Sequence, residues 1–229
     1  MNDIHRVTAY FGIVTVLGGL PPFVQSQSVH QKTSTLIAQV SAEEFNNQGL
    51  EKALRGDYKG AIADYTRSLQ LNPQNANAYY NRGLAHRRLY DYGGAIADYT
   101  RSLQLNPQNA NAYNNRGFAR RRLRDYQGAI ADFTQALQLN PKDANAYYNR
   151  GVAYSKLGDY WGEIEDYNQA IQLNPNYADA YYNRGLSRSR LGDQQGAIKD
   201  YQKAADLYRN QGKGFDYQDA ITAIKKLHL

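Results

Sequence analysis

A unit of 34 residues, repeated five times, constrains this 229-residue chain more than any other feature. The run ADYTRSLQLNPQNANAY begins at Ala63 and returns letter for letter at Ala97. A period in this range indicates a stack of supersecondary units, each of which packs only on its neighbours. The sequence therefore predicts an elongated array and not a globular enzyme core. Prolines and glycines keep the same spacing, at Pro73, Pro107, Pro141 and Pro175 and at Gly49, Gly83, Gly117, Gly151 and Gly185.

Each repeat holds two stretches with the hydrophobic period of a helix. Numbered from the alanine at 42, 76, 110, 144 or 178, the first predicted helix covers roughly positions 2–14 and the second roughly 18–31. The second helix should end at Asn-Pro, because proline disfavours helical geometry in the residue before it. Each repeat is thus predicted to be a helical hairpin, in which Gly83 faces Ala95 and Ser102. Five aspartates in the turns are suited to cap the second helices: Asp57, Asp91, Asp125, Asp159 and Asp193.

The pattern resembles the tetratricopeptide repeat of bacterial multi-repeat arrays, with an aromatic residue at position 4, Gly at 8, Ala at 20, an aromatic at 24, a small residue at 27 and Pro at 32. Three departures are local. Glu163 replaces the alanine of the other units, Tyr90 and Arg124 replace the usual glycine between helices, and the fifth unit lacks its proline. The resemblance implies an all-α, right-handed α-solenoid of five hairpins plus a capping helix, at residues 42–75, 76–109, 110–143, 144–177, 178–211 and 212–229.

The N-terminus differs in kind from the repeats. Fourteen mostly apolar residues, Val7 to Leu20, precede two prolines and the small-residue site Val24-Gln25-Ser26. This order is typical of a secretory signal peptide, here residues 1–26, and the run is shorter than the ~20 residues that span a bilayer. Residues 27–41 are rich in Ser, Thr and Gln and are predicted to form a flexible tether. We expect export to the periplasm or another extracytoplasmic lumen. The alternatives are an uncleaved membrane anchor at residues 7–20 and a chance apolar start.

Composition excludes several kinds of chemistry. The chain has no cysteine, so disulfides, thiolate metal sites and cysteine nucleophiles are impossible. The four histidines, at 5, 30, 86 and 228, show no ligand spacing. No phosphate-binding glycine loop and no nucleophile with an adjacent base occurs. We therefore expect a protein without catalytic residues, metal or cofactor, whose net charge of +6 allows acidic partners.

Two repeated substitutions depart together from the family's pattern. Arginine stands at position 7, where the family has an apolar residue, and aspartate at position 23, where it has an aromatic. A half-buried guanidinium needs a carboxylate, which the facing helix could supply through two parallel hydrogen bonds. The alternative is that the arginines bind an external anion. The predicted pairs are Arg82 with Asp98, Arg116 with Asp132, Arg150 with Asp166, and Arg184 with Asp200.

The resemblance also implies a concave groove lined by positions 2, 5, 6, 9, 12 and 13 of the first helices. Position 6 is asparagine throughout: Asn47, Asn81, Asn115, Asn149 and Asn183. A ladder of carboxamides could bind the main chain of an extended peptide, although asparagine here is also simply common in the family. Aromatic and apolar contacts come from Tyr80, Tyr148, Tyr182, Leu84 and Phe118. A basic rim, which would also favour the helix dipole, comprises Arg87, Arg88, Arg121, Arg122, Lys156 and Arg190.

These features predict a non-enzymatic scaffold that binds an extended, preferably acidic segment of another protein. The family's clamp for a C-terminal carboxylate is missing, because no lysine stands at position 2 or 5 of any repeat. Two other functions stay open. Helical repeats can bind single-stranded RNA, here through the basic rim. By analogy with exported bacterial arrays, the chain could also assist assembly of a membrane or envelope complex.

The N-terminal pattern predicts processing. When the protein is made in its own cell, the mature chain should begin near Gln27, and intact-mass measurement checks this. A full-length chain starting at Met1 in the soluble cytoplasm would contradict export. A full-length chain in the membrane fraction would favour the anchor.

Overall fold

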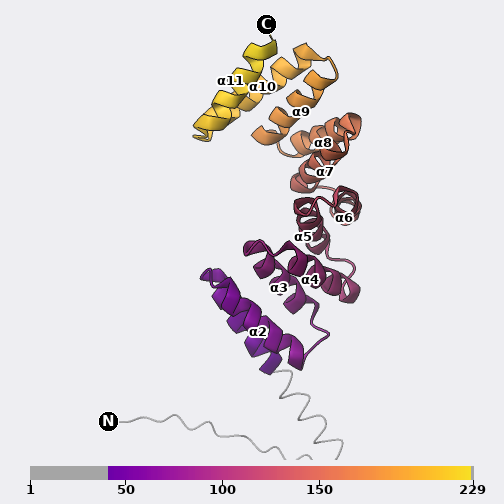
Figure 1. Cartoon of the computed structure of the whole chain (residues 1–229), viewed down its shortest axis with the longest axis vertical. Coiled ribbons are helices and arrows are strands. Elements are labelled where there is room, and N and C mark those ends of the chain that lie inside the picture. The colour runs from indigo at the N-terminus through magenta and orange to yellow at the C-terminus, as the bar shows by residue number, and fades with distance from the viewer. Residues whose placement is uncertain (1–40, 228–229) are drawn as a thin grey trace, which may run out of the picture.

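The computed structural model describes residues 41–227, which fold into helices joined by short turns (Figure 1). The predicted signal and tether, residues 1–40, lie outside the described residues. Within the described part, none of the helices has the length and apolarity to cross a bilayer. After a helix over residues 41–54 come α2 (Tyr58–Leu71), α3 (Ala76–Arg88), α4 (Tyr92–Leu105), α5 (Ala110–Arg122), α6 (Tyr126–Leu139), α7 (Ala144–Leu157), α8 (Tyr160–Leu173), α9 (Ala178–Arg190), α10 (Gln194–Asn210) and α11 (Gly214–Leu227).

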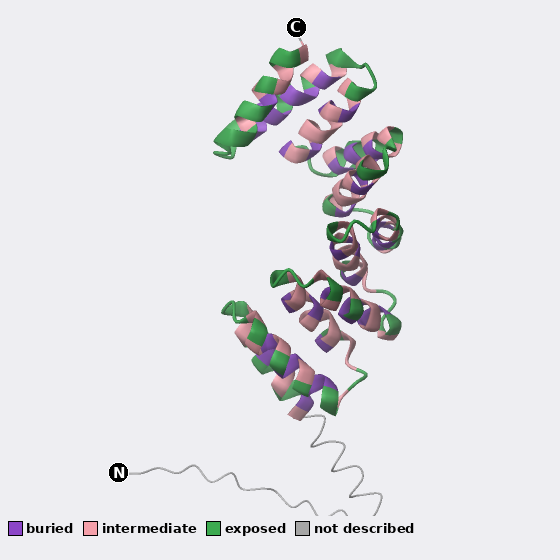
Figure 2. Cartoon of the chain, in the orientation of Figure 1, coloured by how far each residue is buried: buried purple, intermediate pink, exposed green. Residues whose placement is uncertain are grey.

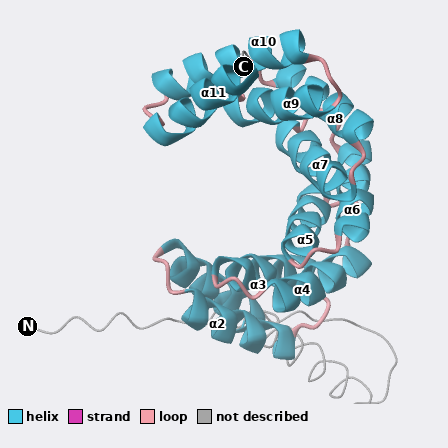
Figure 3. Ribbon diagram, turned by 45° about the horizontal axis from the view of Figure 1, so that its top comes forward, coloured by secondary structure: helices cyan, strands magenta, loops and turns pink. Residues whose placement is uncertain are grey.

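The helices pack in chain order into a curved array, so the predicted all-α solenoid is confirmed (Figure 3). The first helices of the hairpins, such as α5, α7 and α9, line the inside of the arc, and the second helices, such as α6 and α8, form its outside. Buried residues follow the seams between helices and do not gather in one central core (Figure 2). Each hairpin therefore depends on its neighbours for burial, as in other solenoids.

The helix ends follow the predicted signals. The turn aspartates cap the second helices: Oδ1 of Asp57, for example, accepts a hydrogen bond from the Gly60 amide at 2.9 Å, and Asp125 does the same for Gly128. The second helices of the first four repeats end at the leucine before Asn-Pro. In the fifth repeat, which lacks the proline, α10 runs for 17 residues where α8 has 14. Proline is thus what stops these helices.

The close approach within a hairpin is made to an aromatic ring. A Cβ atom built on Gly83 would lie 2.8 Å from the ring of Tyr99, and one on Gly151 would lie equally close to Tyr167. The expected neighbours of Gly83, Ala95 and Ser102, are buried, but the nearest side chain is the position-24 tyrosine. Glycine at position 8 is therefore required by the volume of that ring.

Two turns carry backbone strain. Tyr90 and Arg124 have φ angles of 62° and 66°, in the left-handed region where three other turns place Gly56, Gly158 and Gly192. The geometry of the turn is therefore kept even where its usual glycine is absent. A left-handed conformation costs a residue with a side chain about 1–2 kcal/mol.

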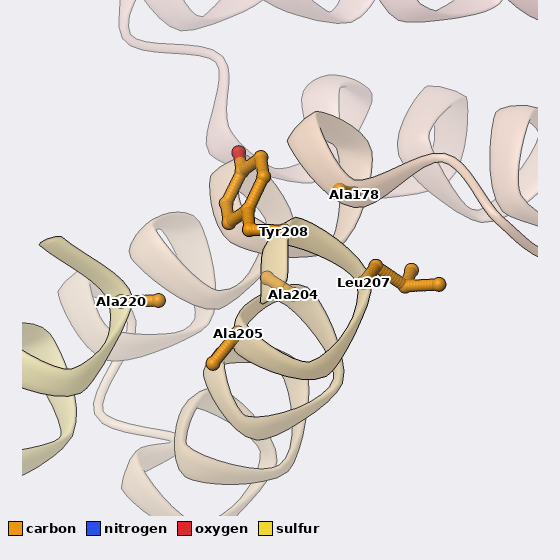
Figure 4. Close-up of a cluster of buried hydrophobic side chains, with 6 residues drawn as sticks. All are labelled: Ala178, Ala204, Ala205, Leu207, Tyr208 and Ala220. Atoms are coloured by element: carbon orange, nitrogen blue, oxygen red, sulfur yellow. The ribbon is translucent and has the colours of Figure 1, made fainter. Parts of the chain in front are cut away.

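The helix α11 covers the C-terminal end of the array. Ala220 is buried against Ala204, Ala205 and Tyr208 of α10 (Figure 4), and Ile221 packs at the edge of this cluster. Ile224 and Leu227, expected on the same side, are partly buried. The helix thereby shields the apolar face that a sixth repeat would otherwise cover.

The position-7 arginines bridge three helices each. Within the hairpin, Nε and Nη2 donate to the two oxygens of the position-23 aspartate at 2.6 to 3.0 Å, in all four predicted pairs. The remaining Nη1 donates backward to the preceding repeat, to Thr66, Thr100, Thr134 or Asn168, at 2.7 to 3.1 Å. Each guanidinium also lies over the aromatic ring at position 4, as Arg116 does over Tyr113 at 5.5 Å. The arginine therefore joins consecutive repeats as well as the two helices of one hairpin.

The aspartates differ in how many cations they face. Asp132 also accepts a hydrogen bond from Arg120 at 2.8 Å, and Asp200 accepts one from Arg188. In the fourth repeat, Tyr154 stands where the third and fifth repeats have Arg120 and Arg188. Arg150 is therefore the one ion-pair partner of Asp166 among residues 41–227. Burial raises the pKa of Asp166, and Arg150 opposes that rise. The pair in the fourth repeat is thus the least compensated.

We expect this difference to appear in stability. Arg150→Leu leaves a buried carboxylate without a cation and should lower the free energy of unfolding by roughly 3–5 kcal/mol. Arg116→Leu leaves Asp132 with Arg120, so its loss should be smaller, roughly 1–3 kcal/mol. Adding Asp166→Tyr to Arg150→Leu should recover most of the loss. Chemical denaturation measures all three, and near-additive losses in the double variant would contradict the pairing.

Glu163 is buried. Its side chain is 1% exposed, whereas Trp161 beside it is 75% exposed, so the turn does not shift to bring the carboxyl into water. Burial raises the pKa of Glu163, while a hydrogen bond with Ser155 and the charge of Arg190 oppose that rise. Its Oε2 atom has no hydrogen-bond partner among residues 41–227. A buried oxygen without a partner is destabilising.

Glu163→Ala restores the residue that the other four repeats have, and should stabilise the fold by on the order of 1 kcal/mol at neutral pH. Because the folded state raises the pKa of Glu163, the folded state gains stability when that carboxyl takes up its proton. The advantage of the variant should therefore shrink as the pH falls. Thermal unfolding of both proteins from neutral to acidic pH checks this prediction. A variant less stable than the wild type at neutral pH would contradict it.

Candidate functional site

The position-6 asparagines of the third, fourth and fifth repeats are each hydrogen-bonded to the repeat before them. Nδ2 of Asn115 donates to the hydroxyl of Tyr80 at 3.0 Å, and Nδ2 of Asn183 donates to that of Tyr148 at 3.1 Å. Asn149 follows a repeat with asparagine in place of this tyrosine, and its Oδ1 accepts from Arg121 at 3.4 Å. These bonds position the three carboxamides but use only part of the two donors and one acceptor oxygen of each. Three members of the ladder are therefore held in place, and Asn47 and Asn81 occupy its first two positions.

The inner tyrosines are half-buried and packed on the aromatic residues at position 24. Tyr80 lies 5.8 Å from Tyr99 between ring centroids, and Tyr182 lies 5.4 Å from Tyr201. Burial raises the pKa of Tyr80 and of Tyr148, so both hydroxyls stay neutral at physiological pH. Leu84 and Phe118, at position 9, are also half-buried. The face thus offers ring edges and hydroxyls at fixed places.

The six residues expected to form one basic rim fall into two groups. Arg87 and Arg121 turn inward and lie over Phe118 at 5.4 and 5.2 Å, with their Nε atoms buried and without a partner among residues 41–227. Burial lowers the pKa of Arg121. The exposed members stand at position 13: Arg88, Arg122, Lys156 and Arg190. The rim available to a partner therefore consists of these four cations.

The two position-13 residues that end α5 and α9 pack on tyrosine rings of the preceding repeat. Arg122 lies over Tyr92 at 5.5 Å and its Nε donates to the hydroxyl of that tyrosine, and Arg190 lies over Tyr160 at the same distance. Both tyrosines belong to the second helix of the preceding repeat. The rings restrict the guanidinium groups without neutralising their charge.

Acidic cavities flank this basic stretch. At the C-terminal end, a cavity of about 170 Å³ is lined by Tyr148, Tyr182 and Tyr208 together with Asp179, Asp216 and Asp219. At the N-terminal end, a shallow one is lined by Glu43, Glu44 and Glu51. Across the described part of the chain, no group of histidine and carboxylate side chains is arranged to hold a metal ion. The charge of the inner face therefore alternates along its length.

Several contacts of this face were missed by sequence reasoning. They are contacts between one repeat and the next. The position-7 arginines donate to threonines, Asn115 and Asn183 donate to tyrosines, and Arg87 and Arg121 turn inward to reach the following repeat. The recurrence of threonine 16 residues before each arginine in three repeats was the available signal for the first of these.

Solved structures with the same fold cover most of this chain. A crystal structure of MamA is 29% identical, with a TM-score of 0.70, and the match covers 72% of this chain and 96% of that one. MamA from Desulfovibrio magneticus RS-1 is 24% identical, with a TM-score of 0.71, 75% of this chain covered and 97% of that one. YrrB, described as a TPR protein with an unusual peptide-binding site, is 20% identical, with a TM-score of 0.71 and coverage of 90% and 98%.

A comparison with curated proteins gave no match. Family models, by contrast, match all five repeats, from residue 49 onward. The one described as TPR repeat matches residues 49–89, 91–123, 119–158 and 159–192, and the one described as tetratricopeptide repeat matches residues 178–211. These spans include the five position-8 glycines. They also include the position-6 asparagines of the second to fifth repeats. The chain therefore belongs to the tetratricopeptide repeat family.

Proposed function

We propose that this protein is a non-enzymatic scaffold that binds an extended segment of another protein along its inner face. The observation that carries the proposal is the asparagine at position 6 of every repeat. One repeat apart, these carboxamides offer donors and acceptors at regular intervals to a peptide main chain, without selecting its sequence. YrrB, an array of the same fold, is described as having a peptide-binding site, which is consistent with this use.

The exposed position-13 cations give the central part of the face a preference for acidic side chains. Arg88, Arg122 and Lys156 follow one another at successive repeats with no ion-pair partner among residues 41–227. Long-range attraction of this kind acts mainly on the rate of association. We further propose that the protein works outside the cytoplasm, on the strength of the N-terminal signal pattern.

The asparagines should contribute about the same binding free energy to the complexes with different partners. Replacing Asn81, Asn115 and Asn149 together by alanine should weaken the binding of each partner captured from the native compartment. The binding free energy should fall by about 1 kcal/mol per lost hydrogen bond. Isothermal titration with segments of the captured proteins measures this. Undiminished binding by the triple variant would place the working surface elsewhere.

Tyr80→Phe is the matched control for Asn115. It removes the hydroxyl that accepts from Asn115 and leaves the carboxamide in place. The change should lower stability slightly and leave affinity within about threefold, because the peptide-facing group is retained. Equal losses from Tyr80→Phe and Asn115→Ala would mean that the carboxamide only joins the repeats.

The exposed and buried arginines should behave differently. Arg88→Gln with Arg122→Gln should slow association with an acidic partner and flatten its salt dependence, with little change in stability. Arg87→Gln with Arg121→Gln should instead lower the melting temperature, because these side chains fill space between repeats. Stopped-flow association at several salt concentrations checks the first pair. If a single-stranded RNA binds with a steep salt slope and acidic peptides do not, RNA binding replaces this proposal.

A further inference from the structure

A cavity of about 150 Å³ opens between the fourth and fifth repeats, with the buried carboxyl of Glu163 in its wall. Its other walls come from Ser155 of α7, Tyr167 of α8, and Asn183 and Leu186 of α9. Oε2 of Glu163 has no hydrogen-bond partner among residues 41–227, although its side chain is 99% removed from solvent. The cavity thus presents an unsatisfied acceptor in a restricted space.

The same place in the two preceding repeats is filled by an arginine. Ser155 stands at position 12, where the second and third repeats have Arg87 and Arg121. Arg87 lies over Phe118, the position-9 residue of the next repeat, which corresponds to Leu186. Arg121 donates to Asn149, the position-6 residue of the next repeat, which corresponds to Asn183. The walls of the cavity are therefore the contacts that an arginine side chain makes one and two repeats earlier.

Two features meet only in the fourth repeat, and both make this place more negative. It lacks the arginine at position 12, as the first and fifth repeats also do, and it alone has a carboxyl at position 20, where the other repeats have the fully buried Ala61, Ala95, Ala129 and Ala197. From this we infer that the cavity receives the guanidinium group of an arginine side chain from the bound segment, which pairs with Glu163. The inference rests on the proposed function and assigns one side chain of the segment.

Two cations, Lys156 and Arg190, also line the cavity. They repel a bound guanidinium group, but a comparable repulsion is tolerated one repeat earlier. In the third repeat the half-buried Arg121 lies beside Arg122, and it has no carboxylate at position 20 to offset its charge. The adjoining cavity shares Asn183 and carries Asp179, Asp216 and Asp219, which makes this end of the inner face favourable to a cation.

Titration of the full-length chain with N-acetyl-arginine methylamide, followed by amide chemical shifts, tests the site. The neutral isostere N-acetyl-citrulline methylamide serves as the control ligand. We expect saturable shifts around Glu163 with the arginine derivative, and binding weaker by roughly tenfold or more with citrulline or in Glu163→Gln, since a charged hydrogen bond is lost. Absence of saturable shifts in the wild type, or equal binding by Glu163→Gln, would overturn the inference.

Ser155→Arg supplies the missing side chain from within the protein. It should abolish binding of the arginine derivative and raise the melting temperature, and the rise should vanish in the Glu163→Gln background. Ser189→Arg is the matched control, because it places arginine at position 12 of the fifth repeat over Ala197, and it should leave binding unchanged. Retained binding in Ser155→Arg would contradict the assignment. Such a failure would concern the cavity at Glu163 and would leave the proposed role of the asparagines standing.

Discussion

The guanidinium group at position 7 is the interaction on which the rest of the array depends. It lies over the aromatic ring of its own helix, binds the carboxylate of the second helix through two hydrogen bonds, and donates its last N–H to the preceding repeat. An apolar contact at this place also holds a hairpin together, but hydrophobic packing has less directional preference than a hydrogen bond. The planar fork of arginine fixes distance and angle together. Four such bridges therefore set the orientation of one hairpin on the next, and with it the spacing of the asparagines on the inner face.

Much of the fold could be predicted because its signals are local. The aspartate caps, the stop at Asn-Pro and the helical period each act within a few residues, and all three were confirmed. The partners Arg116 and Asp132 were predictable for a related reason: a buried charge requires an opposite one, and a hairpin brings a single helix face within reach.

The contacts that could not be predicted cross from one repeat to the next. Whether Arg87 turns inward or lies on the rim depends on the angle between hairpins, which the period of the sequence does not specify. The bond from Asn115 to Tyr80 depends on that same angle. Within the hairpin, Gly83 faces the second helix as expected, and the ring of Tyr99 is the part of that helix that lies nearest to it. The contacts that sequence reasoning missed thus lie mainly between hairpins.

Near-identity of the repeats makes their differences informative. The second and third repeats share long stretches of sequence and have a half-buried arginine at position 12, whereas the fourth has Ser155 and Glu163 and leaves a cavity. Since the hairpin geometry is maintained throughout, these differences act on the chemistry of the inner face and not on the fold. The face consequently changes from a basic centre to an acidic C-terminal end.

The most direct test of the account is the location of a partner on the array. Benzoylphenylalanine can replace Leu84 or Leu186, which stand at position 9 of the inner helices, or Gln104 or Gln138, which are exposed on the second helices. Irradiation in the native compartment, followed by mass spectrometry, identifies what lies within reach of each. The account predicts cross-links to one protein segment from the inner positions and none from the outer ones. Cross-links to the same partner from Gln104 and Gln138, with none from Leu84 and Leu186, would contradict it.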